Sequence, residues 1–197
     1  MTGTPLESAT VAASQDSDAQ ALRAVSRQLP TGVSVLTTAH HGVVHAATVS
    51  TTSVVCQRPL TLSVSLRRGS LMGRLAVESG QFLVNVLSSR QALLADWFAN
   101  PERPPGQAQF DLIKWEPDDA TGLPVLCEAL ARLVCRVTDH VQLGQSDDLV
   151  IAEVLGGTAG RGRPLVNFDG QLHDVEFRDV VRRQSWRTPG MATAALD

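Results

Sequence analysis

The sequence has 197 residues, 43% of them hydrophobic, with a formal net charge of −3. This length suits one domain with terminal extensions, and the hydrophobic content is enough for a real core. A general nucleic-acid binder would carry a clustered basic excess, which the acidic balance excludes. Tyrosine is absent and aromatics make up only 4%, so there is no stacking platform for single strands. No apolar run approaches the roughly 18 residues that cross a bilayer, so no membrane partner is expected.

The three cysteines, Cys56, Cys127 and Cys135, are scattered among apolar residues and form no CxxC motif. Free cysteine is usually a small buried hydrophobe, so all three are expected to be reduced and buried. The N-terminus lacks the charged-then-apolar layout of a signal peptide. Together these features predict a cytoplasmic protein.

The two ends of the chain differ in composition from its middle. Residues 1–17 are small and polar without a consistent apolar face, which predicts a disordered N-terminal arm. Residues 181–197 are interpreted as a similar C-terminal tail, leaving 18–180 as the folded domain. A short helix is expected to begin near Asp16 or Ser17 and to end at the "LPTG" turn, because apolar residues recur at helical spacing at Ala19, Leu22, Val25 and Leu29.

Most of the remaining chain has the pattern of strands. A hairpin is expected over 32–39 and 43–55, followed by strands over 60–66, 81–88, 130–143, 149–157 (ending in a glycine turn) and 164–175. Short helices are expected over 69–80 and 89–100, the second with Leu93, Leu94, Trp97 and Phe98 facing inward, and 101–110 is expected to be a loop. Strands follow one another directly, so the sequence predicts a mainly β protein, a closed antiparallel barrel with helices at its ends.

Common catalytic motifs are missing from the sequence. It contains no GxSxG, no HExxH, no GxxxxGK[ST] and no GxGxxG, which leaves no basis for a hydrolase triad, a metal site, a P-loop or a Rossmann fingerprint. The "GRGR" stretch over 160–163 is more simply a solvated turn than a phosphate clamp. No catalytic acid, base or nucleophile and no metal ligand are therefore assigned.

Polar residues gather after two of the predicted strands. The stretch "TVSTTS" over 48–53 offers five hydroxyls in six residues, and "RRGS" over 67–70 follows the next strand. Hydroxyl and backbone N–H donors at strand ends and helix starts suit a phosphate, and an arginine adds charge. The alternative is a β-forming segment on a half-wet face, and the residues alone leave both interpretations open.

The order of several weak motifs resembles the flavin reductase family. "LPTGVSVLTT", "TVSTTSVVCQRPL", "FLVNVL", "GLPVLCEALARLVC" and "IAEVL" occur in the family's order over about residues 22–175. The resemblance implies a homodimer of split β-barrels with short flanking helices. It also implies that FMN or FAD binds near the dimer interface, that NADH or NADPH donates the hydride, and that reduced flavin goes to a partner monooxygenase.

The resemblance also implies which residues bind the flavin. The PTG turn contributes Thr31 and Gly32, and the family's flavin-binding segment corresponds to residues 48–53. The loop after the next strand is expected near the flavin phosphate. The implied cofactor-binding residues are Thr31, Gly32, Thr48, Val49, Ser50, Thr51, Thr52, Ser53, Arg67, Arg68, Ser70 and Asn85. Because hydride transfer depends on proximity and alignment more than on an acid or base, the lack of a triad fits this chemistry.

One motif departs from the family. The family's G-D-H motif, whose histidine is implicated in holding the nicotinamide cofactor, falls on Gln145, Ser146 and Asp147. An ionised aspartate cannot donate a hydrogen bond and is a poor neighbour for a pyrophosphate. Three functions stay open: a reductase that tolerates the change, a flavin-dependent oxygenase or oxidase of the same fold acting on a small natural product, or a non-catalytic flavin carrier.

Overall fold

The structure is a computed structural model that describes residues 18 and 20–179. The predicted arm at 1–17 and the predicted tail at 181–197 lie outside the described residues. A helix over residues 20–26 precedes the strands, as predicted, and its expected start near Asp16 also lies outside this range. The described part contains no helix long and apolar enough to cross a membrane.

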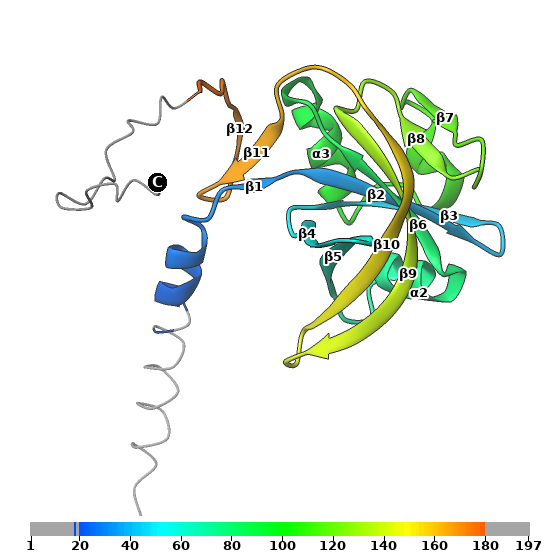
Figure 1. The fold of residues 1–197 in the computed structure, drawn as a ribbon, viewed down its shortest axis with the longest axis horizontal. Coiled ribbons are helices and arrows are strands. Elements are labelled where there is room, and N and C mark those ends of the chain that lie inside the picture. The colour runs from blue at the N-terminus through cyan, green and yellow to red at the C-terminus, as the bar shows by residue number, and fades with distance from the viewer. Residues whose placement is uncertain (1–17, 19, 180–197) are drawn as a thin grey trace, which may run out of the picture.

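A seven-stranded sheet forms the body of the protein (Figure 1), in the order β3-β2-β6-β9-β10-β5-β4. Every pairing in it is antiparallel, and the sheet curls around a buried interior, which confirms the predicted mainly β split barrel. The strands are β2 (Ser34–His40), β3 (Val43–Val49), β4 (Ser53–Gln57), β5 (Leu60–Arg67), β6 (Gln81–Val86), β9 (Ala131–Leu143) and β10 (Asp147–Ala159).

A smaller sheet lies beside the barrel in Figure 1, in the order β1-β11-β12. It consists of β1 (Thr31–Gly32), β11 (Leu165–Phe168) and β12 (Gln171–Asp174). The single strand predicted over 164–175 is therefore a hairpin. Its turn is made by Asp169 and Gly170, both with positive φ, and an Asp-Gly pair is a strong signal for such a turn.

Two other strand predictions differ from the structure in an informative way. The strand expected over 43–55 is interrupted at 50–52, so its polar residues form a corner between β3 and β4. The glycine turn expected after 149–157 is absent, because β10 continues to Ala159 through a β-bulge near Val154. Gly157 is needed there for close approach: a Cβ would lie 2.4 Å from the carbonyl oxygen of Arg132.

The two predicted helices are present as α2 (Leu71–Ser79) and as η1 (Ser89–Gln91) continued by α3 (Ala92–Ala99). Ser70 caps α2 through a hydrogen bond from the Gly73 N–H, and Gly80 ends the helix with positive φ. The inward face predicted for the second helix is wrong at Leu93, which is 85% exposed. Phe98 is buried and Leu94 and Trp97 are half-buried, as predicted, and Ala95, which was not predicted, completes the buried face.

The interior consists of two apolar clusters on opposite sides of the sheet. One lies among β5, β6, β9 and β10 and is closed by α2, with Phe82 and Met72 at its centre. The other lies between β2, β3 and α3 and includes Phe98 and Phe110. Cys135 belongs to the first cluster, where burial raises the pKa of its thiol to about 12. The prediction of a buried cysteine is wrong for Cys56, which is exposed on β4.

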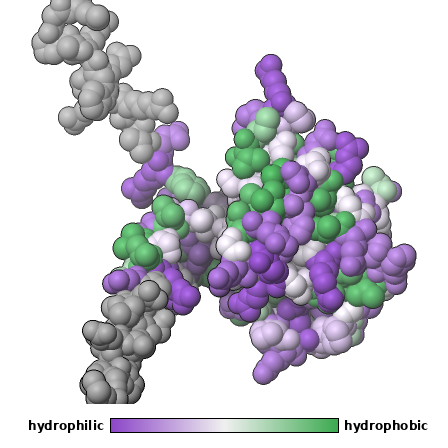
Figure 2. Space-filling model, turned by 90° about the horizontal axis from the view of Figure 1, so that it is seen from below, coloured by the Kyte–Doolittle hydropathy of each residue, from purple (hydrophilic) through white to green (hydrophobic). Residues whose placement is uncertain are grey.

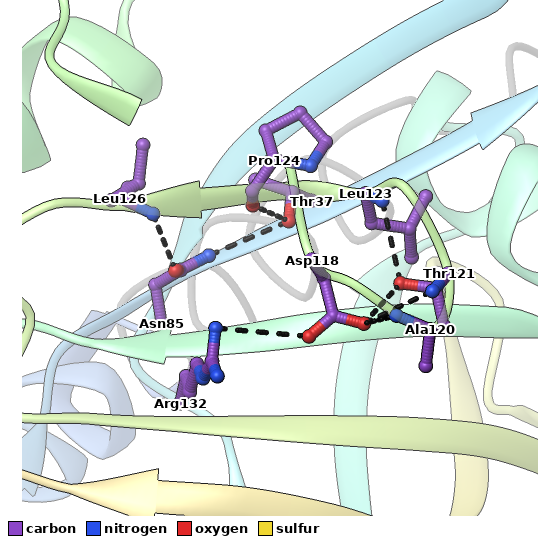
Figure 3. Close-up of polar contacts among 9 residues, drawn as sticks. All are labelled: Thr37, Asn85, Asp118, Ala120, Thr121, Leu123, Pro124, Leu126 and Arg132. Carbon is purple, nitrogen blue, oxygen red and sulfur yellow. Dashed lines mark hydrogen bonds and ion pairs between the residues drawn. The ribbon is translucent and has the colours of Figure 1, made fainter. Parts of the chain in front are cut away.

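The segment predicted as a loop after α3 contains the 3-10 helix η2 (Gly106–Phe110), and it is followed by an unpredicted hairpin of β7 (Trp115–Pro117) and β8 (Pro124–Leu126). Figure 3 shows how side chains attach this hairpin to the barrel. Asn85 accepts a hydrogen bond from the Leu126 N–H and donates to the Val35 carbonyl, while Thr37 donates to the Pro124 carbonyl. Asp118 caps the turn between the two short strands.

Candidate functional site

A cleft of about 610 Å³ opens between β3, the end of β5, the start of α2 and the end of α3. This size is typical of pockets for small ligands. Of the twelve residues predicted to bind a cofactor, the cleft brings together six: Thr48, Val49, Ser50, Thr51, Arg67 and Ser70. Its floor includes the apolar side chains of Leu66 and Met72, which belong to the core cluster under α2.

Hydroxyl groups fix the corner where β3 ends. Thr48 donates from its hydroxyl to the Ala95 carbonyl of α3, at 2.7 Å, and Thr51 donates to the Ser65 carbonyl of β5, at 2.8 Å. Both hydroxyl protons are thus used within the protein, so these threonines shape the cleft. The Ser50 hydroxyl, between them on the cleft wall, donates no hydrogen bond to another described residue.

One end of the cleft is suited to a phosphate. Arg67 is exposed at the end of β5 and has no carboxylate within salt-bridge distance in the described part of the chain. The N-terminus of the nine-residue helix α2 lies next to it, starting at Leu71. The N–H groups of a first helical turn have no carbonyl partner within the helix, and the helix dipole favours an anion there.

The opposite end of the cleft is formed by residues that were not predicted: His45, Phe98, Ala99, Pro101 and Arg103. Arg103 donates to the Asn100 carbonyl at 2.7 Å and to the Ala46 carbonyl, and it approaches the Gln109 amide oxygen at 3.4 Å. Its guanidinium also lies 5.9 Å from the centre of the Phe98 ring. No periodicity in "PERPPGQAQF" indicates this arrangement, because it depends on tertiary hydrogen bonds.

The state of His45 follows from its neighbour. A terminal guanidinium nitrogen of Arg103 lies 3.4 Å from the His45 Nε2, and a guanidinium can only donate. Nε2 is therefore the accepting nitrogen, and the proton of the neutral ring is on Nδ1. Burial, together with the charge of Arg103, lowers the pKa of His45 to about 4. At neutral pH the ring is uncharged.

The other predicted residues lie outside this cleft. Thr31 and Gly32 line a separate, mainly apolar pocket of about 710 Å³ beside β11 and β12. Thr52 has a buried hydroxyl oxygen without a hydrogen-bond partner in the described structure, as does Thr31. Ser53 is exposed at the start of β4. Asn85 is fully buried, and its amide is engaged in the contacts of Figure 3.

Arg68 points away from the cleft, because successive residues of an extended chain face opposite sides. It donates to the Asp148 carboxylate at 3.0 Å and to the carbonyls of Gly144, Gln145 and Asp147. The hydrogen bond from Arg68 lowers the pKa of the Asp148 carboxyl, with a smaller effect from His140. Arg68 therefore binds the tip of the β9–β10 hairpin instead of the position expected for a phosphate contact.

The predicted nicotinamide-site residues form this tip. Gln145 and Ser146 belong to the three-residue turn and are exposed, and Asp147 begins β10. The Asp147 carboxylate accepts a hydrogen bond from the Ser146 hydroxyl at 2.6 Å, whereas Asp148 pairs with Arg68. As expected for adjacent residues on a strand, the two aspartates do not act as a carboxylate pair.

A comparison with protein families matches residues 26–176 to the flavin reductase like domain. This chain belongs to the flavin reductase family. The match covers the barrel, the cleft and the hairpin tip, so residues 145–147, where the resemblance implies the G-D-H motif, lie within the matched domain.

Several relatives support the same family. The chain is 59% identical over 161 residues to an NADPH-flavin oxidoreductase of Streptomyces viridifaciens, covering 82% of this chain and 83% of the relative. It is 33% identical to the reductase component of a 4-nitrophenol 4-monooxygenase/4-nitrocatechol 2-monooxygenase of Rhodococcus opacus, over 88% and 89% of the two chains. Among solved structures, BorF, the flavin reductase component of a bacterial two-component tryptophan halogenase, superposes with a TM-score of 0.75 at 28% identity, over 81% of this chain and 99% of that one.

The lowered pKa of His45 predicts a pH dependence of stability. The unfolded chain binds a proton near the ordinary pKa of 6.5 and the folded one only near 4, so the free energy of unfolding falls as pH drops from 6.5 towards 4. With allowance for the partial exposure of the ring, the loss is about 1–2 kcal/mol. Urea unfolding at pH 7 and pH 5 is expected to show this loss in the wild type and a smaller one in His45→Gln. The control His40→Gln should keep the wild-type difference, and an equal loss in His45→Gln would contradict the assignment.

Proposed function

We propose that this chain is an NAD(P)H:flavin oxidoreductase that reduces FMN or FAD and supplies the reduced flavin to a partner monooxygenase. The observation that carries the proposal is the cleft. In this member of the family it combines an arginine, a helix N-terminus and several hydroxyl groups above an apolar floor. The names of the relatives, among them an NADPH-flavin oxidoreductase and the reductase component of a monooxygenase, support the same reaction.

Each part of the cleft has a definite task in this proposal. Arg67 and the start of α2 hold the flavin phosphate, and Ser50 offers a hydroxyl beside it. Thr48 and Thr51 keep β3, β5 and α3 at a fixed separation. The bound flavin accepts the hydride itself, so the protein supplies orientation and electrostatics and needs no acid or base. The unpaired cysteines fit the reducing, cytoplasmic setting that belongs to this proposal.

The decisive assay follows FMN and NAD(P)H together. The wild-type protein is expected to bind FMN and to oxidise NADPH or NADH in its presence, followed by nicotinamide absorbance. Arg67→Gln should raise the dissociation constant for FMN about tenfold, the loss of one charge-assisted contact at an exposed site, and should change riboflavin binding little. Arg74→Gln on the exposed face of α2 is the matched control.

Binding of FMN with nicotinamide oxidation at the background rate would contradict the reductase assignment. Chemically reduced flavin with candidate substrates would then distinguish an oxygenase from a carrier.

The changed motif gives a second test. If Asp147 limits nicotinamide binding, Asp147→His is expected to lower the apparent KM for NAD(P)H several-fold, because it replaces a negative charge by a hydrogen-bond donor near a pyrophosphate. The flavin dissociation constant should stay unchanged. The control is Asp119→His, an exposed substitution in the turn between β7 and β8. An unchanged KM would mean that other groups bind the nicotinamide cofactor.

The homodimer expected for the family is also part of the proposal, with 18–180 as its folded domain. All five residues of β4 are exposed although the strand contains Val54, Val55 and Cys56, and β4 is an edge of the large sheet. Figure 2 shows further hydrophobic surface on the outlying part of the molecule that carries β1, β11 and β12. Exposed apolar side chains gathered on an edge strand are typical of an interface. The exposed apolar residues include Leu22, Val25, Leu29, Val54, Val55, Val141, Leu143, Leu155, Phe168 and Phe177.

Sedimentation velocity tests the dimer. The wild type is expected to sediment at twice the chain mass, and Val55→Asp should shift it towards the monomer because a charge would be buried at the interface. Leu112→Asp, at a residue that is 90% exposed outside these surfaces, should leave the mass unchanged. A monomeric wild type at micromolar concentration would refute the dimer without affecting the reductase assignment.

A further inference from the structure

Arg103 brings a positive charge into the cleft wall without a counter-ion. No Asp or Glu of the described chain lies within salt-bridge distance of its guanidinium, whereas Arg68, Arg132 and Arg136 each have a carboxylate partner. The groups that fix Arg103 are neutral: the carbonyls of Asn100 and Ala46 and the side chains of Gln109 and His45. Neutral partners hold the guanidinium in place but do not cancel its charge.

His45 contacts Arg103 without adding a second charge beside it. Its Nε2 accepts from Arg103, so the ring stays neutral at physiological pH and adds neither attraction nor repulsion of unit charge. The Phe98 side chain, which is 1% exposed, covers one side of the guanidinium. The field of a partly desolvated charge acts over a longer range than that of a fully hydrated one. Arg103 is therefore a fixed electrostatic source in the cleft.

The two arginines of the cleft lie at opposite ends of it. The cleft follows β3 from His45 to Val49, about 13 Å of extended chain, and continues into the corner at Ser50 and Thr51. Arg67 belongs to the Thr51 end, because Thr51 is bonded to Ser65 two residues before Arg67. Arg103 belongs to the His45 end. A flavin mononucleotide whose phosphate were held by Arg67 and the start of α2 would have its ring system in the part of the cleft that leads to Arg103.

The reaction changes the charge of that ring. A hydride carries two electrons and one proton from the dihydronicotinamide to the flavin. The nicotinamide leaves with one more positive charge, and the reduced flavin keeps one negative charge unless it takes a second proton from solvent. A positive group beside the ring is therefore worth more after the transfer than before it.

We propose that Arg103 tunes the flavin in this cleft, its unneutralised guanidinium favouring the reduced, anionic flavin over the oxidised one. This inference rests on the proposed function. It assigns Arg103 a role in the redox equilibrium, distinct from the anchoring of the phosphate by Arg67, and it gives the segment 100–109 a part in the chemistry of the cleft.

The experiment measures the dissociation constants of oxidised FMN and of dithionite-reduced FMN under anaerobic conditions, together with the midpoint potential of the bound flavin. Arg103→Gln removes the charge. Since Arg103 also braces its segment, a second pair of variants leaves it untouched. Ala99→Glu introduces a negative charge at an exposed residue that lines the same end of the cleft, and Ala99→Gln is its neutral match.

The expected result is a shift of the affinity ratio towards oxidised FMN by roughly tenfold in Arg103→Gln and in Ala99→Glu, but not in Ala99→Gln or Arg103→Lys. A tenfold shift corresponds to a midpoint potential about 30 mV lower for a two-electron couple. Ratios that are equal in the wild type and in both charge variants would overturn the inference while leaving the reductase assignment intact. A wild type that binds no FMN would instead refute the proposed function.

Riboflavin, which lacks the phosphate, separates tuning from anchoring. If Arg103 tunes the ring, Arg103→Gln alters the ratio for reduced and oxidised riboflavin as it does for FMN. A variant that weakens both redox states of FMN equally and leaves riboflavin unaffected would show that Arg103 binds the phosphate, which overturns the inference.

Discussion

The amide of Gln109 holds the cleft wall against the barrel. This side chain is fully buried, and it replaces a missing strand beside β3, which is an edge of the large sheet. Its oxygen accepts from the Ala46 N–H and its nitrogen donates to the Val44 carbonyl, while the Gln109 carbonyl accepts from the Trp97 indole. An edge strand with unpaired polar groups is otherwise a site of association. The position of Arg103, and with it the polarity of one end of the cleft, depends on these bonds.

The sequence was sufficient for the barrel because strand formation leaves a local pattern. The alternation in "LTLSVSL" places Leu62, Val64 and Leu66 in the core, and the long strands β9 and β10 follow from their Val-rich stretches. The predictions were wrong where the same local pattern fits two different structures. A polar corner breaks 43–55, a turn divides 164–175, and Leu93 has the spacing of a buried residue without any partner to cover it.

The site could be predicted only where polar residues occur at the ends of predicted strands. Hydroxyls and an arginine at strand ends correctly indicated residues that line one end of the cleft. Gln109 and Arg103 could not be found in this way, because their partners are distant in the sequence. Arg103 donates to the Ala46 carbonyl, 57 residues away, and Gln109 donates to the Val44 carbonyl, 65 residues away. Asn85 and Arg68 show the opposite limit: a family pattern marks the residues, but only the structure shows that their polar atoms are engaged with the protein.

The neighbouring arginines Arg67 and Arg68 make different contacts. Arg67 lines the cleft and has no carboxylate partner among residues 20–179, whereas Arg68 donates to four groups of the hairpin tip. The tip is thus held in a defined position relative to β5, with Asp147 at the position where the family resemblance implies a histidine. A substitution at 145–147 changes the side chains that the tip presents while the bonds from Arg68 to backbone carbonyls persist. On the proposal that the tip binds the nicotinamide cofactor, this binding can vary independently of the proposed flavin cleft.

A protein that supplies reduced flavin must bind it and also let it go. A positive charge at the ring end favours reduction, and by the same interaction it slows the departure of the reduced product. The other end adds little to this. Arg67 is exposed, so the phosphate contact proposed for it is screened by solvent and salt. In these two proposals the partly buried Arg103 sets the redox preference and also retains the reduced flavin, whereas the exposed Arg67 adds only a weak hold that does not oppose release further.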